Sequence, residues 1–164
     1  TEIRPSDLIK YARFDDFAGM EYQKELEKMA WVQGGRTQTA PAQRLTDFIS
    51  GHESATLPAV SYFPGVTSSP LHSWLPENLV RLLSEGFRQF GTTMRGFVTR
   101  EAVVVGVESR TSSPLRIPRD PSTYEHIEIE GLYPCGEGSG YSGGIVSSAV
   151  DGICVAEAIA LRLK

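Results

Sequence analysis

Residues 131–152 read GLYPCGEGSGYSGGIVSSAVDG, and this stretch decides the fold that the sequence predicts. A short apolar run ends in a cluster of glycines from Gly136 to Gly144, and a pattern typical of a helix follows at once. Glycine allows a backbone to approach a neighbour closely, and the first turn of a helix presents unpaired N–H groups. We therefore expect a strand, a tight turn and a helix whose start faces an anionic or electron-rich ligand.

The composition limits the classes of protein that this chain can belong to. It has 164 residues, of which 40% are apolar, a formal net charge of −4 and scattered Lys and Arg. Such a chain is long enough to bury a sizeable core. The negative charge argues against nucleic acid or an anionic membrane surface as a partner. No stretch has the length of a transmembrane helix and none resembles a signal peptide.

The cysteines and the first residue add two expectations. Cys135 and Cys154 form no CxxC pair and have no histidine at metal-binding spacing, so we expect a reduced, cytoplasmic protein without a metal site. The sequence starts abruptly at Thr1 instead of Met (TEIRPSDL), and this favours a piece of a longer polypeptide or a processed product.

Hydrophobic periodicity predicts an α+β chain with helices, loops and few strands. Helices are expected at 19–33, 41–49, 76–90 and 142–163, the first three ended by Gly34, Gly51 and Gly91. Buried strands are expected at 102–107 and 131–135, a short extended piece at 115–117, and loops over 52–74. Because helices and loops precede residue 100 while strands and one helix follow it, we place a boundary there, between regions 1–99 and 100–164.

Three interpretations of the glycine cluster compete. Residues 138–143 match GxGxxG, but a dinucleotide-binding unit needs a second strand ending in an acidic residue about 20 residues further on. Residues 140–144 match GxSxG, but every histidine precedes Ser142, whereas an α/β-hydrolase needs one after its serine. The third interpretation is a turn that serves only close packing. Glu137 favours a ligand, since a carboxylate beside free N–H groups suits a ribityl chain and a flavin carbonyl.

The same residues resemble a known family. GLYPCGEGSGYSGG followed by IVSSAVDGICVAEAI resembles the C-terminal flavin-binding motif of FAD-dependent oxidoreductases of the glutathione-reductase-like superfamily. Upstream, VGVESRTSSPLRIPRD resembles a signature of uncharacterised bacterial FAD-dependent dehydrogenases, often labelled NAD-utilising dehydrogenases. GMEYQKELEKMAW, GGRTQTAPAQRLTDF, SYFPGV and LPENLVRLLSEGFRQF fit the middle region of that family, so the resemblance covers nearly the whole chain.

The resemblance implies that two regions of the chain have different roles. Residues 1–99 would be an inserted, substrate-facing region, and residues 100–164 the C-terminal return of an FAD-binding domain. The partner would be an N-terminal Rossmann part of the same polypeptide. The parent would transfer hydride between FAD, NADH or NADPH, and an unidentified small-molecule substrate, while the fragment alone would be inactive. The alternative is a non-catalytic ligand- or protein-binding domain that keeps the turn as a scaffold.

The resemblance also implies roles for individual residues, although it assigns no catalytic one. Gly136 and Glu137 would contact the ribityl or pyrophosphate part of FAD. The N–H groups of Gly143, Gly144 and Ile145 would meet the flavin N1/O2 edge, where the helix dipole would stabilise the reduced flavin. The complete cofactor-binding set is Gly136, Glu137, Gly138, Gly143, Gly144 and Ile145, and the flavin- or substrate-proximal set is Arg110, Thr111, Ser112 and Ser113.

Other residues near the turn have two interpretations each. Cys135 invites a redox role, but a buried thiol is favoured because no second cysteine adjoins it. Asp151 and Gly152 inside the last helix indicate close packing or a polar contact. Arg116 and Arg119, together with Arg110, either hold an acidic group of a substrate or nicotinamide cofactor or lie on the surface. The isolated His72 and His126 are not favoured as acid–base groups.

Overall fold

The computed structural model describes residues 2–163, which divide into two compact units. Unit 1 comprises Thr1–Asp7 and Lys24–Glu108, and unit 2 comprises Leu8–Gln23 and Ser109–Lys164. A 3₁₀ helix, Pro5–Phe17, and helix α1, Ala18–Gln33, each have residues in both units. The different division that the family resemblance implies, at residue 100, stays a prediction.

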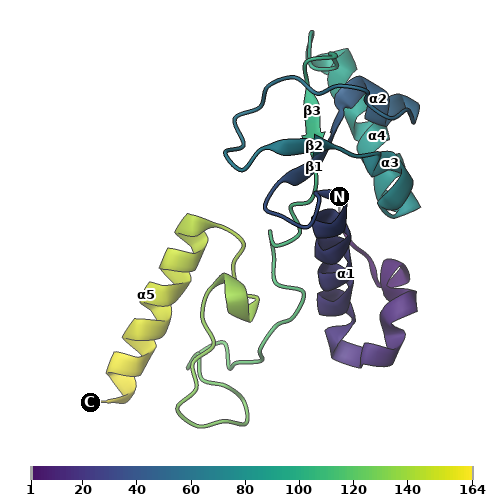
Figure 1. The fold of residues 1–164 in the computed structure, drawn as a ribbon. Coiled ribbons are helices and arrows are strands. Elements are labelled where there is room, and N and C mark those ends of the chain that lie inside the picture. Colours follow the sequence, from purple (N-terminus) through teal and green to yellow (C-terminus); the bar gives the residue numbers. More distant parts are fainter. Residues whose placement is uncertain (1, 164) are drawn as a thin grey trace. The chain divides into compact units, whose positions relative to one another are not determined.

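Unit 1 is built around a small mixed sheet (Figure 1). Strand β1 (Ala40–Arg44) lies in the centre, between β2 (Val66–Ser68) and β3 (Val103–Val105). β2 runs parallel to β1, and β3 runs antiparallel to it. Helices α2 (Leu45–Ser50), α3 (Leu71–Trp74) and α4 (Glu77–Thr93) pack against one another, and α2 and α3 also contact β1.

The sheet and helices of unit 1 enclose an apolar core. Phe48 is 1% exposed and meets Phe87 of α4 edge to face, with ring centroids 6.0 Å apart. The buried Gln43 is paired, because its side chain donates to the His52 carbonyl at 2.6 Å. The buried apolar residues of this unit are Leu26, Ala30, Pro41, Ala42, Leu45, Phe48, Leu71, Leu75 and Leu79.

The expected helix over 41–49 is wrong in its first half. Residues up to Arg44 form β1, and only Leu45–Ser50 is helical. The helical pattern misleads because tertiary pairing outweighs local propensity: Ala42 pairs with Ser68 on one side and Val105 on the other. The expected stop is confirmed, since Gly51 caps α2 with a left-handed backbone (φ 71°).

Other expected elements of unit 1 are confirmed with shifted limits. Helix α1 ends at Gln33, before Gly34, while α4 starts after Pro76 and continues past Gly91 to Thr93. The expected loop over 52–74 also holds β2 and α3. The expected strand at 102–107 is shorter, and its burial on both faces is wrong: β3 is an edge strand and Val105 is 42% exposed.

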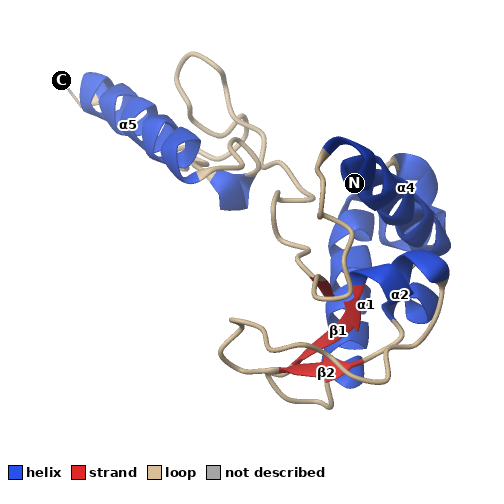
Figure 2. Cartoon of the chain, turned by 90° about the horizontal axis from the view of Figure 1, so that it is seen from above, coloured by secondary structure: helices blue, strands red, loops and turns tan. Residues whose placement is uncertain are grey.

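Unit 2 has one long helix and otherwise little regular structure. Helix α5 (Ile145–Arg162) follows a short 3₁₀ turn, Glu137–Ser139, and most of the chain from 106 to 144 is loop (Figure 2). The expected strand at 131–135 does not form, because Gly131 is left-handed (φ 77°) and Pro134 has no N–H. The piece at 115–117 is no strand either, although Ile117 N donates to the Ser139 carbonyl.

Helices together with a small sheet confirm the α+β class that the sequence predicts. Among the described residues, every helix is too short or too polar to cross a membrane.

Candidate functional site

The glycine-rich segment 136–144 forms a closed turn ahead of α5. Gly136 and Gly140 have left-handed backbones, with φ of 72° and 85°. Gly140 N donates to the Glu137 carbonyl at 2.9 Å, and Tyr141 N donates to the Gly136 carbonyl at 3.2 Å. A Cβ at Gly140 would clash with the carbonyl oxygen of Leu115, so the turn packs backbone against backbone here. Close packing therefore explains this one glycine.

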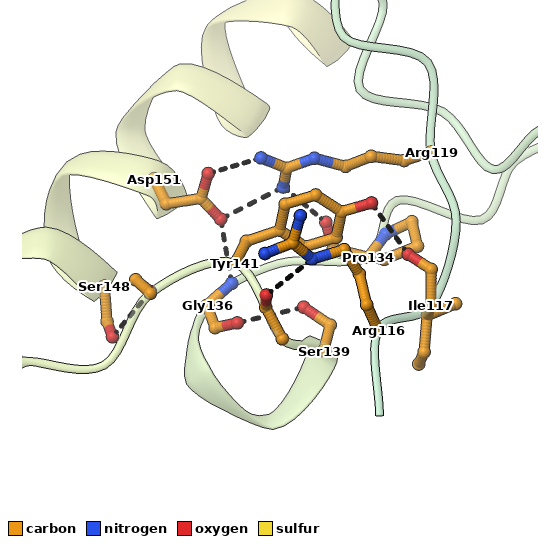
Figure 3. A network of polar contacts seen from close by, with 11 residues as sticks. Arg116, Ile117, Arg119, Pro134, Gly136, Ser139, Tyr141, Ser148 and Asp151 are labelled. Carbon is orange, nitrogen blue, oxygen red and sulfur yellow. Dashed lines mark hydrogen bonds and ion pairs between the residues drawn. The ribbon is translucent and has the colours of Figure 1, made fainter. Parts of the chain in front are cut away.

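An ion pair fixes the start of this turn to the helix that follows it (Figure 3). Arg119 donates to both Asp151 carboxylate oxygens, at 2.6 and 3.0 Å, and the two side chains are only 7% and 13% exposed. The same carboxylate accepts from Gly136 N at 2.8 Å, while Arg119 also donates to the Pro134 carbonyl at 2.7 Å. One buried pair thus joins the loop at 119, the turn and α5.

The charges at this pair shift the pKa values around it. Hydrogen bonds from Arg119 and from the Gly136 amide lower the pKa of Asp151 to about 2, and the carboxylate in turn raises the pKa of Arg119. Desolvation and the nearby Asp151 carboxylate raise the pKa of the Cys135 thiol. A raised pKa favours the protonated thiol over the thiolate that a redox or nucleophilic role requires.

Tyr141 forms the other side of this cluster. The guanidinium carbon of Arg119 lies 3.6 Å from the centre of the Tyr141 ring, and that of Arg116 lies 5.1 Å from it. The Tyr141 hydroxyl donates to the Ile117 carbonyl at 2.9 Å, and Arg116 donates to the Gly140 carbonyl at 2.9 Å. Both arginines therefore have partners within unit 2, and the Arg119 side chain is buried there while Arg116 is exposed.

The structure brings two of the expected groups of site residues together. A Cβ at Gly143 would lie 3.5 Å from the Ser112 hydroxyl and 3.6 Å from the Thr111 carbonyl oxygen. Ser113 instead turns back on its own segment and donates to the Leu115 carbonyl. Arg110, Thr111 and Ser112 are exposed.

The start of α5 is exposed and offers hydrogen-bond donors. Ile145 is 92% exposed, and Gly143 and Gly144 are exposed as well. Within residues 2–163, the N–H groups of Gly143, Ile145 and Val146 have no hydrogen-bond partner, while Gly144 N donates to the Ser147 hydroxyl. Such orphan N–H groups at a helix start attract negative or electron-rich atoms.

Glu137 and Gly138 complete the expected cofactor-binding set. The Glu137 side chain is half-buried, and in the described part of the chain its carboxylate has neither a hydrogen-bond nor an ion-pair partner. Gly138 is exposed, and a Cβ there would meet no atom within 4 Å. Unlike Gly140, Gly138 is therefore not required for packing.

Sequence reasoning missed the central role of Arg119 and Asp151. A signal was present, because a carboxylate beside a glycine inside an apolar helix is unusual, and of the two proposed explanations the structure supports the polar contact. Asp151 makes the polar contact, and a Cβ at Gly152 would lie 3.8 Å from Cys135 Sγ, which is ordinary van der Waals contact. The expected burial of Cys135 is wrong, since this residue is exposed.

The remaining candidate residues have structural partners. His126 Nδ1 accepts from the N–H groups of Glu128 and Ile129 within a turn, and His72 Nδ1 pairs with the Gln43 amide at 2.7 Å. The Ser142 hydroxyl of the GxSxG match pairs with the Ser148 hydroxyl at 2.9 Å. Across residues 2–163, no group of three or more His, Cys, Asp or Glu side chains is arranged to hold a metal ion.

A loop of glycines ahead of an exposed helix start with unpaired N–H groups has a geometry that can bind an anionic or electron-rich ligand. The family model described as "FAD-dependent protein, C-terminal domain-like" matches residues 1–111, so the chain belongs to this family of FAD-dependent proteins. The match includes Arg110 and Thr111 and stops before the turn at 136–144.

A relative extends the similarity beyond that match. An uncharacterised protein of Clostridium beijerinckii is 43% identical over 143 residues, which are 86% of this chain. The aligned part is 27% of the relative, so this chain spans about a quarter of the relative's length.

Proposed function

We propose that this chain is the C-terminal part of a longer, cytoplasmic FAD-dependent oxidoreductase, and that the turn 136–144 and the start of α5 contact the cofactor. Family membership supports the flavin, and the much longer relative supports a larger parent protein. The observation that carries the proposal is the set of unpaired, exposed N–H groups at Gly143, Ile145 and Val146.

The residues present fit the chemistry of FAD. Backbone donors at a helix start suit a phosphate or a flavin carbonyl, because the helix end carries a partial positive charge. The free Glu137 carboxylate suits the hydroxyl groups of a ribityl or ribose unit. The residues that would hold FAD are Gly136, Glu137, Gly138, Gly143, Gly144 and Ile145, with Thr111 and Ser112 beside them. When bound, FAD would supply two-electron redox chemistry.

The chain's own contribution is to bind and orient. The Arg119–Asp151 pair fixes Gly136 and thereby the path of the backbone into the turn. Donors held in place in this way need no reorganisation when negative charge develops next to them. We propose hydride transfer to or from an unidentified small-molecule substrate, with NADH or NADPH as the other hydride carrier.

The first test is the visible absorption of the complete polypeptide that contains this chain, purified without added cofactor. We expect bound-flavin bands that bleach under anaerobic conditions on addition of NADH or NADPH. Bands that bleach with neither nucleotide would restrict the proposal to FAD binding. A colourless protein that also fails to take up FAD would contradict it and favour a non-catalytic binding domain.

A single substitution then tests the site. Glu137→Ala in the complete protein should weaken FAD retention roughly tenfold or more, since a hydrogen bond to a charged group contributes about 1.5–3 kcal/mol. The melting temperature of the cofactor-free protein should not change, because Glu137 has no partner to lose. Glu157→Ala, on the exposed part of α5, is the matched control. Equal FAD content in both variants would remove Glu137 from the site.

A further inference from the structure

Residues 109–116 join the first turns of α1 to the glycine-rich turn, and all these parts belong to unit 2. The structure describes the whole of this segment, which forms neither helix nor strand. Its course therefore depends on a few side-chain contacts. Helix α1 supplies those near the start of the segment, and the turn at 136–144 supplies those at its end.

Helix α1 contacts the segment at two points. The side-chain amide of Gln23 donates to the Ser109 carbonyl at 2.6 Å. One helical turn earlier, Gly19 lies so close to Pro114 that a Cβ on residue 19 would be 2.9 Å from the Pro114 Cβ, closer than real Cβ atoms come. Glycine permits this approach because it has no side chain. Since Gly19 and Gln23 are four positions apart, one face of α1 makes both contacts.

The glycine-rich turn contacts the segment directly after Pro114. Arg116 donates to the Gly140 carbonyl at 2.9 Å, and Gly140 packs so closely on Leu115 that a Cβ there would clash with the Leu115 carbonyl oxygen. The Ser113 hydroxyl donates to the same Leu115 carbonyl at 2.8 Å. The segment is thus held at Ser109, at Pro114 and at its junction with the turn.

Thr111 and Ser112 lie between these fixed points and are exposed. In the described part of the chain the Ser112 hydroxyl has no hydrogen-bond partner, so the neighbouring contacts determine its position. A Cβ on Gly143 would lie 3.5 Å from Ser112 Oγ and 3.6 Å from the Thr111 carbonyl oxygen. A ligand atom that accepts from the unpaired Gly143 N–H is therefore within reach of the Ser112 hydroxyl.

We infer that Gly19 and Gln23 are positioning residues of the proposed cofactor site. They hold Pro114 and Ser109 and thereby keep Ser112 beside Gly143, so that one ligand can bond to both. The inference rests on the proposed function, since the ligand is the FAD that the turn would bind, and it adds α1 to the site. Groups that are already held in place bind more tightly, because binding then has less ordering to offset.

Alanine at position 19 of the complete polypeptide tests the close approach to Pro114. Gly19→Ala should push Pro114 away and raise the dissociation constant of FAD about fivefold or more, as expected for the loss of one hydrogen bond. Gly86→Ala is the matched control, because Gly86 also lies in a helix and a Cβ there would meet no atom within 4 Å. Equal dissociation constants in the two variants would overturn the inference.

A second substitution separates positioning from general damage to α1. Pro114→Gly removes the Cβ that the new side chain at position 19 would meet. In this background, adding Gly19→Ala should change the FAD dissociation constant by less than about twofold, because the two sites act only through their contact. The same fivefold loss in both backgrounds would assign the effect to α1 itself and overturn the inference.

Limited proteolysis of the cofactor-free protein tests the Gln23 contact without flavin. Arg110 is an exposed trypsin site within the segment, and the exposed Arg95 in unit 1 is an internal reference. Gln23→Glu places an acceptor against the Ser109 carbonyl, so cleavage after Arg110 should rise about fivefold relative to cleavage after Arg95. Gln89→Glu, at an exposed position of α4, is the matched control and should leave this ratio unchanged. An unchanged ratio with Gln23→Glu would overturn the role of Gln23.

Failure of this inference and failure of the proposed function give different results. If the unsubstituted protein takes up no FAD, the proposed function fails and the positioning role fails with it. If the unsubstituted protein binds FAD and Gly19→Ala binds it equally well, the positioning role alone fails.

Discussion

The two units of this chain are held together in different ways. Unit 1 buries Phe48, Leu71 and other apolar side chains between a sheet and helices, whereas unit 2 is organised around the buried Arg119–Asp151 pair. Unit 2 also exposes the apolar side chains of α5. Apolar burial is non-directional and grows with area, while a buried ion pair depends on its geometry. We therefore expect the two units to respond differently to the same kinds of change.

The family match ends close to the boundary between the two units. It ends at residue 111, close to Glu108, where the last segment of unit 1 ends. Unit 1 thus holds most of the matched residues and has its own core. Unit 2 holds all of the unmatched ones and has few buried apolar residues. A region with little apolar core gains less stability from burial than unit 1 does.

The largest expected effect is in the core of unit 1. Phe48→Ala removes a side chain that is 1% exposed and stacked edge to face on Phe87, so unfolding of unit 1 should become easier by about 3–5 kcal/mol. Denaturant titration with hydrogen exchange read at α2 and α4 would measure this. Phe63→Ala is the control, since Phe63 is fully exposed and its loss should change little. Similar losses in both variants would contradict a core in unit 1.

The next effect concerns the ion pair of unit 2. Asp151→Ala leaves Arg119 buried without a counter-charge and frees Gly136 N, which should cost about 3 kcal/mol. Hydrogen exchange should accelerate in α5 and in the turn while α2 stays unchanged. The matched control is Glu85→Ala, because the Glu85–Arg81 pair is more than half exposed and should contribute less than about 1 kcal/mol. If both variants behave alike, the ion pair does not organise unit 2.

The difference between local and long-range contacts also explains which elements of the fold could be predicted from the sequence. Long periodic helices such as α1, α4 and α5 are predictable, because their spacing repeats over many residues. β1 was not predictable, since Ala40–Arg44 is a strand only through its pairing with β2 and β3, whose paired residues lie 26 to 63 positions further along the chain. Long-range pairing leaves no local pattern.

The candidate site was likewise predictable only where its residues lie close together in the sequence. The glycines of the turn were visible because they cluster in sequence, and the structure does place Gly143 beside Thr111 and Ser112. The Arg119–Asp151 ion pair that fixes the start of the turn could not be predicted from the sequence, because its two residues are separated by 32 positions. The exposure of Ile153 was unpredictable for another reason: periodicity finds an apolar face but not what covers it.

A pair of glycine substitutions gives a smaller effect within unit 2. Gly140→Ala should destabilise the turn by about 1–3 kcal/mol, because its backbone is left-handed and the new Cβ would clash with the Leu115 carbonyl oxygen. Gly138→Ala should be nearly neutral, since its Cβ would meet nothing within 4 Å. Thermal unfolding and exchange at Tyr141 would compare them. Equal stabilities would show that the turn does not pack against Leu115 as described.

Lowering the pH should have the smallest effect on stability, and it should destabilise unit 2 more than unit 1 without any mutation. The pKa of Asp151 is about 2 in the fold and 3.8 as the ordinary value, so its stabilising effect is complete above pH 4 and is lost as the pH falls through 2. At pH 3 unit 2 should have lost about 1 kcal/mol, whereas burial of Phe48 in unit 1 does not titrate. Exchange at α5 and α2, followed between pH 5 and 2, would show the difference. Asp120, whose pKa is also about 2 through Ser122, titrates in its own exposed turn, and Glu125, whose pKa is lowered by the Gly131 amide and by Arg162, acts at the C-terminal end of α5. Asp151→Asn should therefore abolish the response in the first turns of α5. An unchanged response in that variant would assign the acid sensitivity to another carboxylate and remove the ion pair as the feature that distinguishes unit 2.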